Sequence, residues 1–435
     1  MAQEYPFYTE PSHVQGSVFN VSGNASRDTK TAFDEGRLKI DMVDYIALLE
    51  PTQAPLTTIL TQPVQVPDGQ GYKAVGVRKA PVVGNYEFSW LEDKYSSRFA
   101  RVSSYAVSGD TTIGITAAGA EPAYIFTVGD VVMNIRTGEK FLVKTIGSSS
   151  TITVDSNGRG FGSTASATMV SGDGLMILGS ANAENATARN ANTTKVKKLS
   201  NFTQIFRDTI AISGTFVELD VYGGKDLEYQ RRKKMTEHKL SIERAFLWGE
   251  KKELQTGSAG ATALSTQGHS VRTTGGVFEL IQSGDSFIQD QALNPLTAGD
   301  LNNFARLAFT YGKPKKMVMA GGLFLQAVNE IARGQIRTQV GVSKYGLSVS
   351  TWMTSFGELD IVYNPLFIQD YAGTALVLDM NDNCFRYRYI PNRDTQFLPN
   401  RQDPSMDGRV DEILTECGLE RKEAPRHAML TNIGS

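Results

Sequence analysis

"YQRRKKMTEHKLSIERAFLWGEKK", residues 229–252, is the most charged stretch of this chain. It opens with four consecutive bases and closes on the apolar patch 245–248. From position 235 onward, apolar or aromatic residues return every three or four positions, which places them on one face of a helix. These residues are Met235, His238, Ile242, Ala245, Phe246 and Gly249. A helix over 222–249 would be about 40 Å long, and it is either a nucleic-acid-binding helix or a structural strut with a charged outer face.

The overall charge favours the strut. The chain has 435 residues, enough for two to four compact units. Lys and Arg number 44 against 46 Asp and Glu, which gives a formal net charge of −2, whereas a dedicated nucleic-acid-binding protein carries a basic excess. Glu237, Glu243 and Glu250 accompany the bases, and such mixed charge is typical of a solvated helix face. Any contact of these bases with nucleic acid is therefore expected to be local, weak and independent of sequence.

Residues that usually carry catalysis are sparse in this sequence. The four His are widely spaced, and none lies in an H-E-x-x-H motif. Cys384 and Cys417 are isolated. The glycine-rich stretches 158–162 and 320–322 lack the context of a phosphate-binding loop and predict tight turns. We therefore predict no catalytic residues, no cofactor and no metal site. Chemistry based on carboxylates alone leaves a soluble enzyme with an appended β module as an alternative.

No apolar run approaches the ~18 residues that a membrane-spanning helix needs. The N-terminus also lacks the basic region and apolar core of a secretory signal. We expect no membrane association, and a protein that is made in a cytoplasm and stays soluble or assembles.

The composition divides the chain into unlike parts. Residues 107–180 are rich in Gly, Ser, Thr and Val, and their closely spaced strand candidates predict a small all-β insert. Farther along, Thr297 and Asp300 form a capping pattern before an apolar helical face. The stretch KKMVMA, 315–320, predicts a buried strand, and GGLFLQAVNEIARG, 321–334, predicts a second helix.

The order of these elements, together with four stretches, resembles the major capsid proteins of tailed bacteriophages with the Hong Kong 97-type fold. The stretches are NYEFSWLEDK (85–94), VGDVVMNIRTGEKFLVKTI (128–146), NFTQIFRDTIAISGT (201–215) and ERAFLWG (243–249). The fold class that the resemblance implies is α+β: an N-terminal arm, an extended β loop, a peripheral domain with a long spine helix, and an axial domain. The β insert would be an insertion domain within the extended loop.

The resemblance divides the chain into seven segments. These are the N-terminal arm, 1–36; the start of the peripheral region and extended loop, 37–106; the inserted β domain, 107–180; the linker and return strand of the extended loop, 181–221; the spine helix of the peripheral domain, 222–264; the axial domain, 265–383; and the C-terminal peripheral segment, 384–435.

The resemblance implies a structural protein, not an enzyme. It would self-assemble through pentamers and hexamers into an icosahedral phage head, part of the virion, that is built in the host cytoplasm around double-stranded DNA held non-specifically. The partners would be separate scaffolding, portal and decoration proteins. An encapsulin-like nanocompartment shell that encloses cargo proteins is an alternative with the same fold.

Two sets of residues are candidates for function. Aromatic residues dominate interface hot spots, so Trp90, Phe99 and Phe206 are expected as packing anchors between subunits. Glu92, Asp93 and Arg98 are expected in ion pairs between subunits. The alternative for all six is packing within one chain or contact with solvent. The bases that would face packaged DNA are Arg231, Arg232, Lys233 and Lys234.

Overall fold

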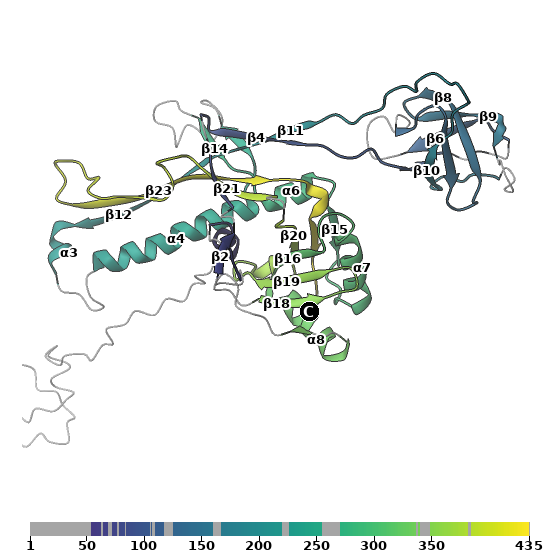
Figure 1. Ribbon diagram of the computed structural model, residues 1–435. Helices are drawn as coiled ribbons and strands as arrows, with labels where there is room; N and C mark the ends of the chain where they lie inside the picture. Colours follow the sequence, from purple (N-terminus) through teal and green to yellow (C-terminus); the bar gives the residue numbers. More distant parts are fainter. Residues whose placement is uncertain are drawn as a thin grey trace, which may run out of the picture.

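The computed structural model describes residues 54–61, 64–67, 72–75, 78–82, 84–104, 106, 109–116, 125–159, 167–219, 226–254, 270–335, 338–339, 349–381 and 384–434. The predicted N-terminal arm, 1–36, lies outside the described residues. The chain has mixed α and β structure: two sheets share one long helix, and a thin two-stranded ribbon carries a small barrel away from them (Figure 1).

The charged segment forms α4, Asp226–Trp248, a helix of 23 residues. The prediction of one long helix here is confirmed, and its length is about 35 Å at 1.5 Å per residue. It lies along a five-stranded sheet in the order β12-β23-β21-β3, with β22 paired to β23 (Figure 1). The strands are β3 (Lys79–Pro81), β12 (Gln204–Ser213), β21 (Phe385–Tyr389), β22 (Gln396–Leu398) and β23 (Gly408–Arg421). The short α3 (Gly214–Glu218) follows β12.

The second half of α4 is buried on two sides. His238, Ile242 and Phe246 belong to the predicted apolar face and are buried, but Glu243 and Leu247 are buried too. The reason is that α2 (Pro55–Thr61) and α6 (Val277–Ser283) also pack on α4, in addition to the sheet. Among the described residues, no helix is both long and apolar enough to span a membrane.

A two-stranded antiparallel ribbon of β4 (Glu87–Glu92) and β11 (Lys197–Phe202) leads from the sheets to the barrel (Figure 1). The barrel closes in the order β10-β5-β6-β9-β8-β7. Its strands are β5 (Phe99–Val102), β6 (Thr112–Thr116), β7 (Asp130–Asn134), β8 (Lys140–Ser148), β9 (Thr151–Arg159) and β10 (Gly174–Ser180). Two smaller ribbons pair β1 (Val64–Pro67) with β2 (Tyr72–Val75) and β13 (Lys252–Leu254) with β14 (Val271–Thr273).

The barrel begins at Phe99, before the boundary at 107 that the composition indicates. In β5, Ala100 and Val102 point into the barrel core, whereas Phe99 points outward. The strand pairs with both β10 and β6, so the barrel cannot close without it. The change in composition at Val107 marks where charged residues become rare, not where the hydrogen-bonded ladder starts.

The second large sheet has seven strands in the order β15-β24-β20-β16-β19-β18-β17. The strands are β15 (Phe287–Asp290), β16 (Lys315–Ala320), β17 (Thr338–Gln339), β18 (Val349–Met353), β19 (Glu358–Tyr363), β20 (Ala375–Leu378) and β24 (Ala428–Thr431). The helices α7 (Ala298–Ala308) and α8 (Gly322–Gln335) accompany it (Figure 1). The predicted Thr297–Asp300 capping box, the KKMVMA strand and the second helix are confirmed.

The C-terminal segment contributes to both sheets. β21, β22 and β23 lie in the five-stranded sheet, but β24 lies in the seven-stranded sheet between β15 and β20. The expected boundary at 384 therefore does not separate the sheets. Ala428, Met429 and Leu430 are all buried, and a strand that is apolar on both faces is stable only inside a sheet covered on both sides.

Candidate assembly surfaces

The β4–β11 ribbon and the residues next to it expose apolar side chains. In β4, Phe88 and Trp90 point inward and are buried, whereas Leu91 is 68% exposed. Tyr95, which follows β4, and Val196, which precedes β11, are 102% and 55% exposed. A two-stranded ribbon is at best marginally stable in water by itself. These side chains therefore form a surface that a second molecule can cover.

Two of the expected interface anchors fill the core of their own chain. Trp90 lies against Phe88, with ring centroids 6.2 Å apart, and its indole N–H donates to Glu92 at 2.8 Å. Glu92 also accepts the backbone N–H of Glu423 at 2.9 Å, so this pair attaches the ribbon to the body. Phe206 is buried on β12, edge-on to His238. For Trp90 and Phe206 the structure shows packing within one chain, which was the alternative expectation. A contact of either residue with another subunit stays a prediction.

The other three candidates lie between the ribbon and the barrel. Asp93 accepts the hydroxyl of Thr194 at 2.9 Å, which joins the two sides of the connection. Arg98 is exposed, and Phe99 is 57% exposed on the outside of the barrel. Their positions leave them open to another molecule, and their role as subunit contacts stays a prediction.

The four bases of α4 are largely occupied by groups of their own chain. Arg231 binds Asp411 of β23 with nitrogen–oxygen distances of 2.5 and 3.0 Å. Burial alone would raise the pKa of Asp411, but hydrogen bonds from Arg231, the Asn400 backbone and Arg409 bring it below its ordinary value. Lys234 lies 2.6 Å and Lys233 3.9 Å from the carboxylate of Glu237. Arg232 is exposed, and among the residues that the structure describes its side chain bonds the carbonyl of Glu228 alone, at 3.4 Å. This arrangement favours the strut over a nucleic-acid clamp.

Three side chains are hydrogen-bonded to one another in the order of a catalytic triad. His238 Nδ1 lies 2.6 Å from Asp208 Oδ2, and Nε2 lies 2.7 Å from Thr415 Oγ1. A nucleophile must be reached by its substrate, but His238 and Thr415 are both 0% exposed. The chain of hydrogen bonds therefore joins α4 to β12 and β23. The sequence placed His238 on the apolar face of the helix, and only the structure supplies its polar partners.

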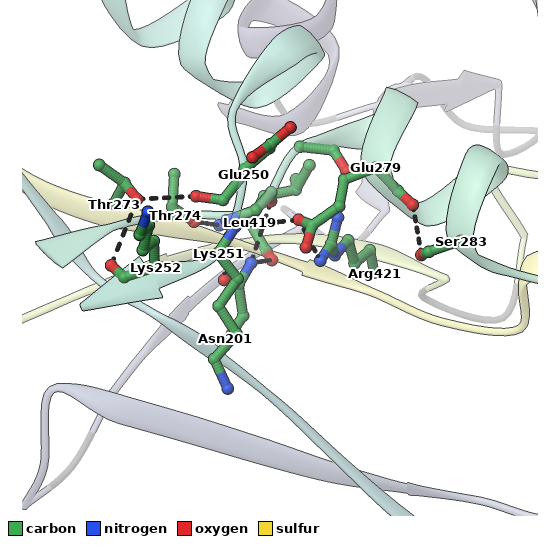
Figure 2. Close-up of polar contacts among 12 residues, drawn as sticks. Asn201, Glu250, Lys251, Lys252, Thr273, Thr274, Glu279, Ser283, Leu419 and Arg421 are labelled. Carbon is green, nitrogen blue, oxygen red and sulfur yellow. Dashed lines mark hydrogen bonds and ion pairs between the residues drawn. The ribbon is translucent and has the colours of Figure 1, made fainter. Parts of the chain in front are cut away.

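A second polar cluster fixes the base of the ribbon to the body (Figure 2). The Asn201 amide donates to the carbonyls of Leu419 at 2.7 Å and Gly275 at 3.0 Å, and its oxygen accepts the Gly275 N–H at 2.8 Å. Next to it, Arg421 donates to Glu279 at 2.6 Å. Sequence reasoning missed Asn201. No signal in the sequence distinguishes it, because Gln204 supplies a second amide in the same stretch 199–206.

The carboxylate of Glu243 is a third polar anchor that sequence reasoning missed. It accepts the backbone N–H groups of Leu56 and Thr57, at 2.8 and 2.7 Å, and also the Thr57 hydroxyl. Burial raises the pKa of Glu243, although these hydrogen bonds act in the opposite direction. The three polar anchors thus join α2 and the five-stranded sheet to α4, and the ribbon to β23 and to the residues before α6.

Comparison with known proteins shows the family to which this chain belongs. The model of the SU10 major capsid protein family matches residues 20–434. No curated protein is similar enough to count as a match. The capsid protein of the native GTA particle is 7% identical, with 94% of this chain and 100% of that chain covered and a TM-score of 0.47. The cyanophage A-1(L) capsid protein is 11% identical, with coverages of 92% and 98% and a TM-score of 0.45.

The holo-SrpI encapsulin of Synechococcus elongatus PCC 7942 is 12% identical, with coverages of 55% and 78% and a TM-score of 0.41. All three TM-scores are below 0.5, so the assignment rests on the family match. Because that match extends over nearly the whole chain, the protein belongs to the SU10 major capsid protein family and is a structural protein of an icosahedral phage head.

Proposed function

We propose that this capsid protein has the Hong Kong 97-type architecture. In this assignment α4 is the spine helix, and the five-stranded sheet belongs to the peripheral domain. The seven-stranded sheet is the core of the axial domain, β4–β11 is the extended loop, and the barrel is an insertion domain within that loop. Residues 1–36 form the N-terminal arm. The subunits form pentamers and hexamers of a shell that encloses double-stranded DNA.

The exposed apolar face of the ribbon is the observation that carries this proposal. Leu91, Tyr95 and Val196 are more than half exposed in a single subunit. Burying a large apolar side chain contributes about 1.5–3 kcal/mol, so a neighbour that covers this face would stabilise the assembly strongly. An extended loop that lies on the adjacent subunit supplies such a cover, repeated around each capsomer.

The charge distribution supports non-specific enclosure of DNA. The chain carries a formal charge of −2, and Arg231, Lys233 and Lys234 lie near carboxylates of the same chain. A shell with such a charge can surround a polyanion without binding it tightly. Scaffolding, portal and decoration proteins are proposed as separate partners, with assembly in the host cytoplasm.

The proposal is tested by expressing the chain and imaging it by negative-stain electron microscopy, with masses from sedimentation. The wild-type chain is expected to give closed shells, rings or curved sheets. The double variant Leu91→Asp/Tyr95→Asp is expected to keep the circular dichroism of the wild type but to remain as small species, because each charge would have to be buried at the contact.

The matched control, Leu91→Met/Tyr95→Phe, keeps the face apolar and is expected to assemble. Wild-type shell yield from the aspartate variant would contradict the proposed role of the ribbon. Shells filled with protein and free of nucleic acid would favour the nanocompartment alternative.

A further inference from the structure

A cleft of ≈ 550 Å³ lies between the ribbon and the body, within the size range of pockets that hold a small ligand. Its apolar lining includes Trp90, Leu280 and Ala424, each 8% exposed. Its rim is mostly basic: it carries Lys94, Lys195, Lys197 and Arg421 against Glu92 and Asp285.

Two lysines of the rim are available to an outside partner. Lys94 is paired with Asp285 at 2.7 Å, and Arg421 with Glu279 at 2.6 Å. Lys195 and Lys197 are exposed, and neither side chain forms a hydrogen bond or ion pair with a residue that the structure describes. The cleft therefore fits a segment with an apolar side chain flanked by carboxylates.

The loop between β22 and β23 has this chemistry. In the sequence DPSMD, 403–407, every residue is exposed, and Met406 is 46% exposed. The Met406 N–H donates to the Asp403 carbonyl at 3.0 Å, which folds the loop into a tight turn. Across the described part of the chain, no cation pairs with the carboxylate of Asp403 or Asp407. The turn thus presents one apolar side chain together with two unneutralised charges.

The loop and the cleft lie at opposite ends of one strand. The loop ends directly before Gly408, the first residue of β23, and Arg421, which lines the cleft, is the last. At about 3.3 Å per residue, the 14 residues of β23 separate them by roughly 40 Å. Figure 1 shows the strand running from the hairpin at its free end to the region of α6. A loop therefore cannot enter the cleft of its own chain.

We propose that the Asp403–Asp407 loop of one subunit docks into the cleft between the ribbon and α6 of the next subunit. Met406 enters the apolar part of the cleft, and Asp403 and Asp407 pair with Lys195 and Lys197 at its rim. Because the two surfaces differ, the contact is head-to-tail, and repetition by rotation closes a ring of subunits. The proposed contact depends on the assembly of this protein into a shell, as proposed above. The loop and the cleft are the surfaces that would hold neighbouring copies together.

Crosslinking tests the contact directly. Both native cysteines, Cys384 and Cys417, are buried, so new surface cysteines can be linked selectively. Shells that carry Met406→Cys together with Ser283→Cys, treated with a short bis-maleimide, are expected to give a ladder of covalent multimers on denaturing gels. Each single variant is the control and is expected to give no ladder beyond a dimer. Closed shells without a ladder would overturn the interface and leave assembly intact.

Charge reversal tests the pairing. Lys195→Glu/Lys197→Glu and Asp403→Lys/Asp407→Lys are each expected to lower shell yield about tenfold, because like charges then face each other across the contact. Both reversals in one chain are expected to recover most of that yield. The matched control is Lys140→Glu, an exposed lysine of the barrel that lines neither the cleft nor the ribbon.

The reversed variants must keep the melting temperature of the unassembled wild-type subunit, which separates a lost contact from a lost fold. Wild-type yield from both single-side reversals would overturn the proposal. Failure of the combined reversal to recover any yield would do the same, as would an equal loss in Lys140→Glu.

Discussion

The carboxylate of Glu243, in the second half of α4, accepts the backbone N–H of Leu56 at 2.8 Å and so caps the first turn of α2 from another part of the chain. The first N–H groups of any helix have no partner within the helix. Ala54, just before α2, has no side chain that could accept them. A negative charge at a helix N-terminus is also favourable. Glu243 thereby fixes the start of α2 against α4.

Replacing Glu243 should therefore loosen α2. We expect Glu243→Ala to lower the free energy of unfolding by roughly 2–4 kcal/mol, because two buried N–H groups lose their acceptor. Urea unfolding of the unassembled subunit measures the loss, and hydrogen exchange over 54–61 locates it. Glu250→Gln is the control, since Glu250 is exposed. Unchanged exchange in α2 would contradict the capping role.

The raised pKa of Glu243 also predicts the sign of a pH effect. A carboxyl whose pKa is higher in the folded protein contributes stability that is fully present below its unfolded pKa and is lost as the pH rises through the folded pKa. The free energy of unfolding of the wild type, relative to that of Glu243→Gln, should therefore decrease as the pH increases. A constant difference across the titration would show that the pKa is not raised.

His427 predicts a pH effect with the opposite sign. Its Nδ1 accepts the Asp379 N–H at 3.1 Å, which assigns the neutral tautomer, and its Nε2–H donates to the Lys422 carbonyl at 3.0 Å. Burial lowers the pKa of His427 to about 4. The neutral ring resists protonation when folded, so stability should fall as the pH drops from about 6.5 toward 4. His427→Gln should show a shallower decline in melting temperature over this range, whereas parallel curves would rule out His427 as the source.

The barrel contains a buried ion pair whose disruption should be costly. Arg159 Nε and Nη2 lie 2.9 and 3.1 Å from the two oxygens of Glu139, and both side chains are at most 1% exposed. We expect Arg159→Met to destabilise the barrel by about 3–5 kcal/mol, because it leaves the buried Glu139 carboxylate without its cation. The exposed neighbour Lys140→Met is the control and should change the stability by less than about 0.5 kcal/mol.

A double-mutant cycle separates the pair from its surroundings. Arg159→Met combined with Glu139→Leu should cost less than the sum of the two single changes, since no unpaired charge remains. Guanidinium unfolding with a probe in the barrel gives the four stabilities. Strict additivity would show that the two side chains do not stabilise each other.

Arg231 and Arg232 of α4 should differ in their effects on stability and on DNA binding. Arg231→Gln removes the main cation from the buried Asp411, and we expect a loss of about 1.5–3 kcal/mol in stability. Arg232→Gln should be neutral for stability, within about 0.5 kcal/mol, since Arg232 is exposed. If any base of this run contacts packaged DNA, Arg232→Gln should reduce the salt dependence of DNA binding by capsomers. Equal effects of both variants on both measurements would contradict this division.

Local signals in the sequence were reliable. The three-to-four spacing of apolar residues predicted α4, and the Thr297–Asp300 pair predicted the start of α7. Both depend on residues within one or two turns of each other, whose geometry is the same in any fold. The ordered motifs of the chain also pointed to the family that the comparison then showed.

The boundaries between the domains and the partners of the buried polar side chains could not be predicted from such local signals. β5 joined the barrel although its composition resembled that of the ribbon, and β24 entered the seven-stranded sheet far from the strands that precede it in sequence. The partners of His238 also depended on which strands came to lie beneath the helix.

Patterns of neighbouring residues were enough to predict the helices α4, α7 and α8 and the strand β16, because these elements depend on residues a few positions apart. The capping of α2 by Glu243 and the pairing of Arg231 with Asp411 could be seen only in the folded chain. Those partners are separated by 187 and 180 positions. Contacts over such separations depend on the path of the entire chain, and the residue types allow many pairings of which the packed fold selects one.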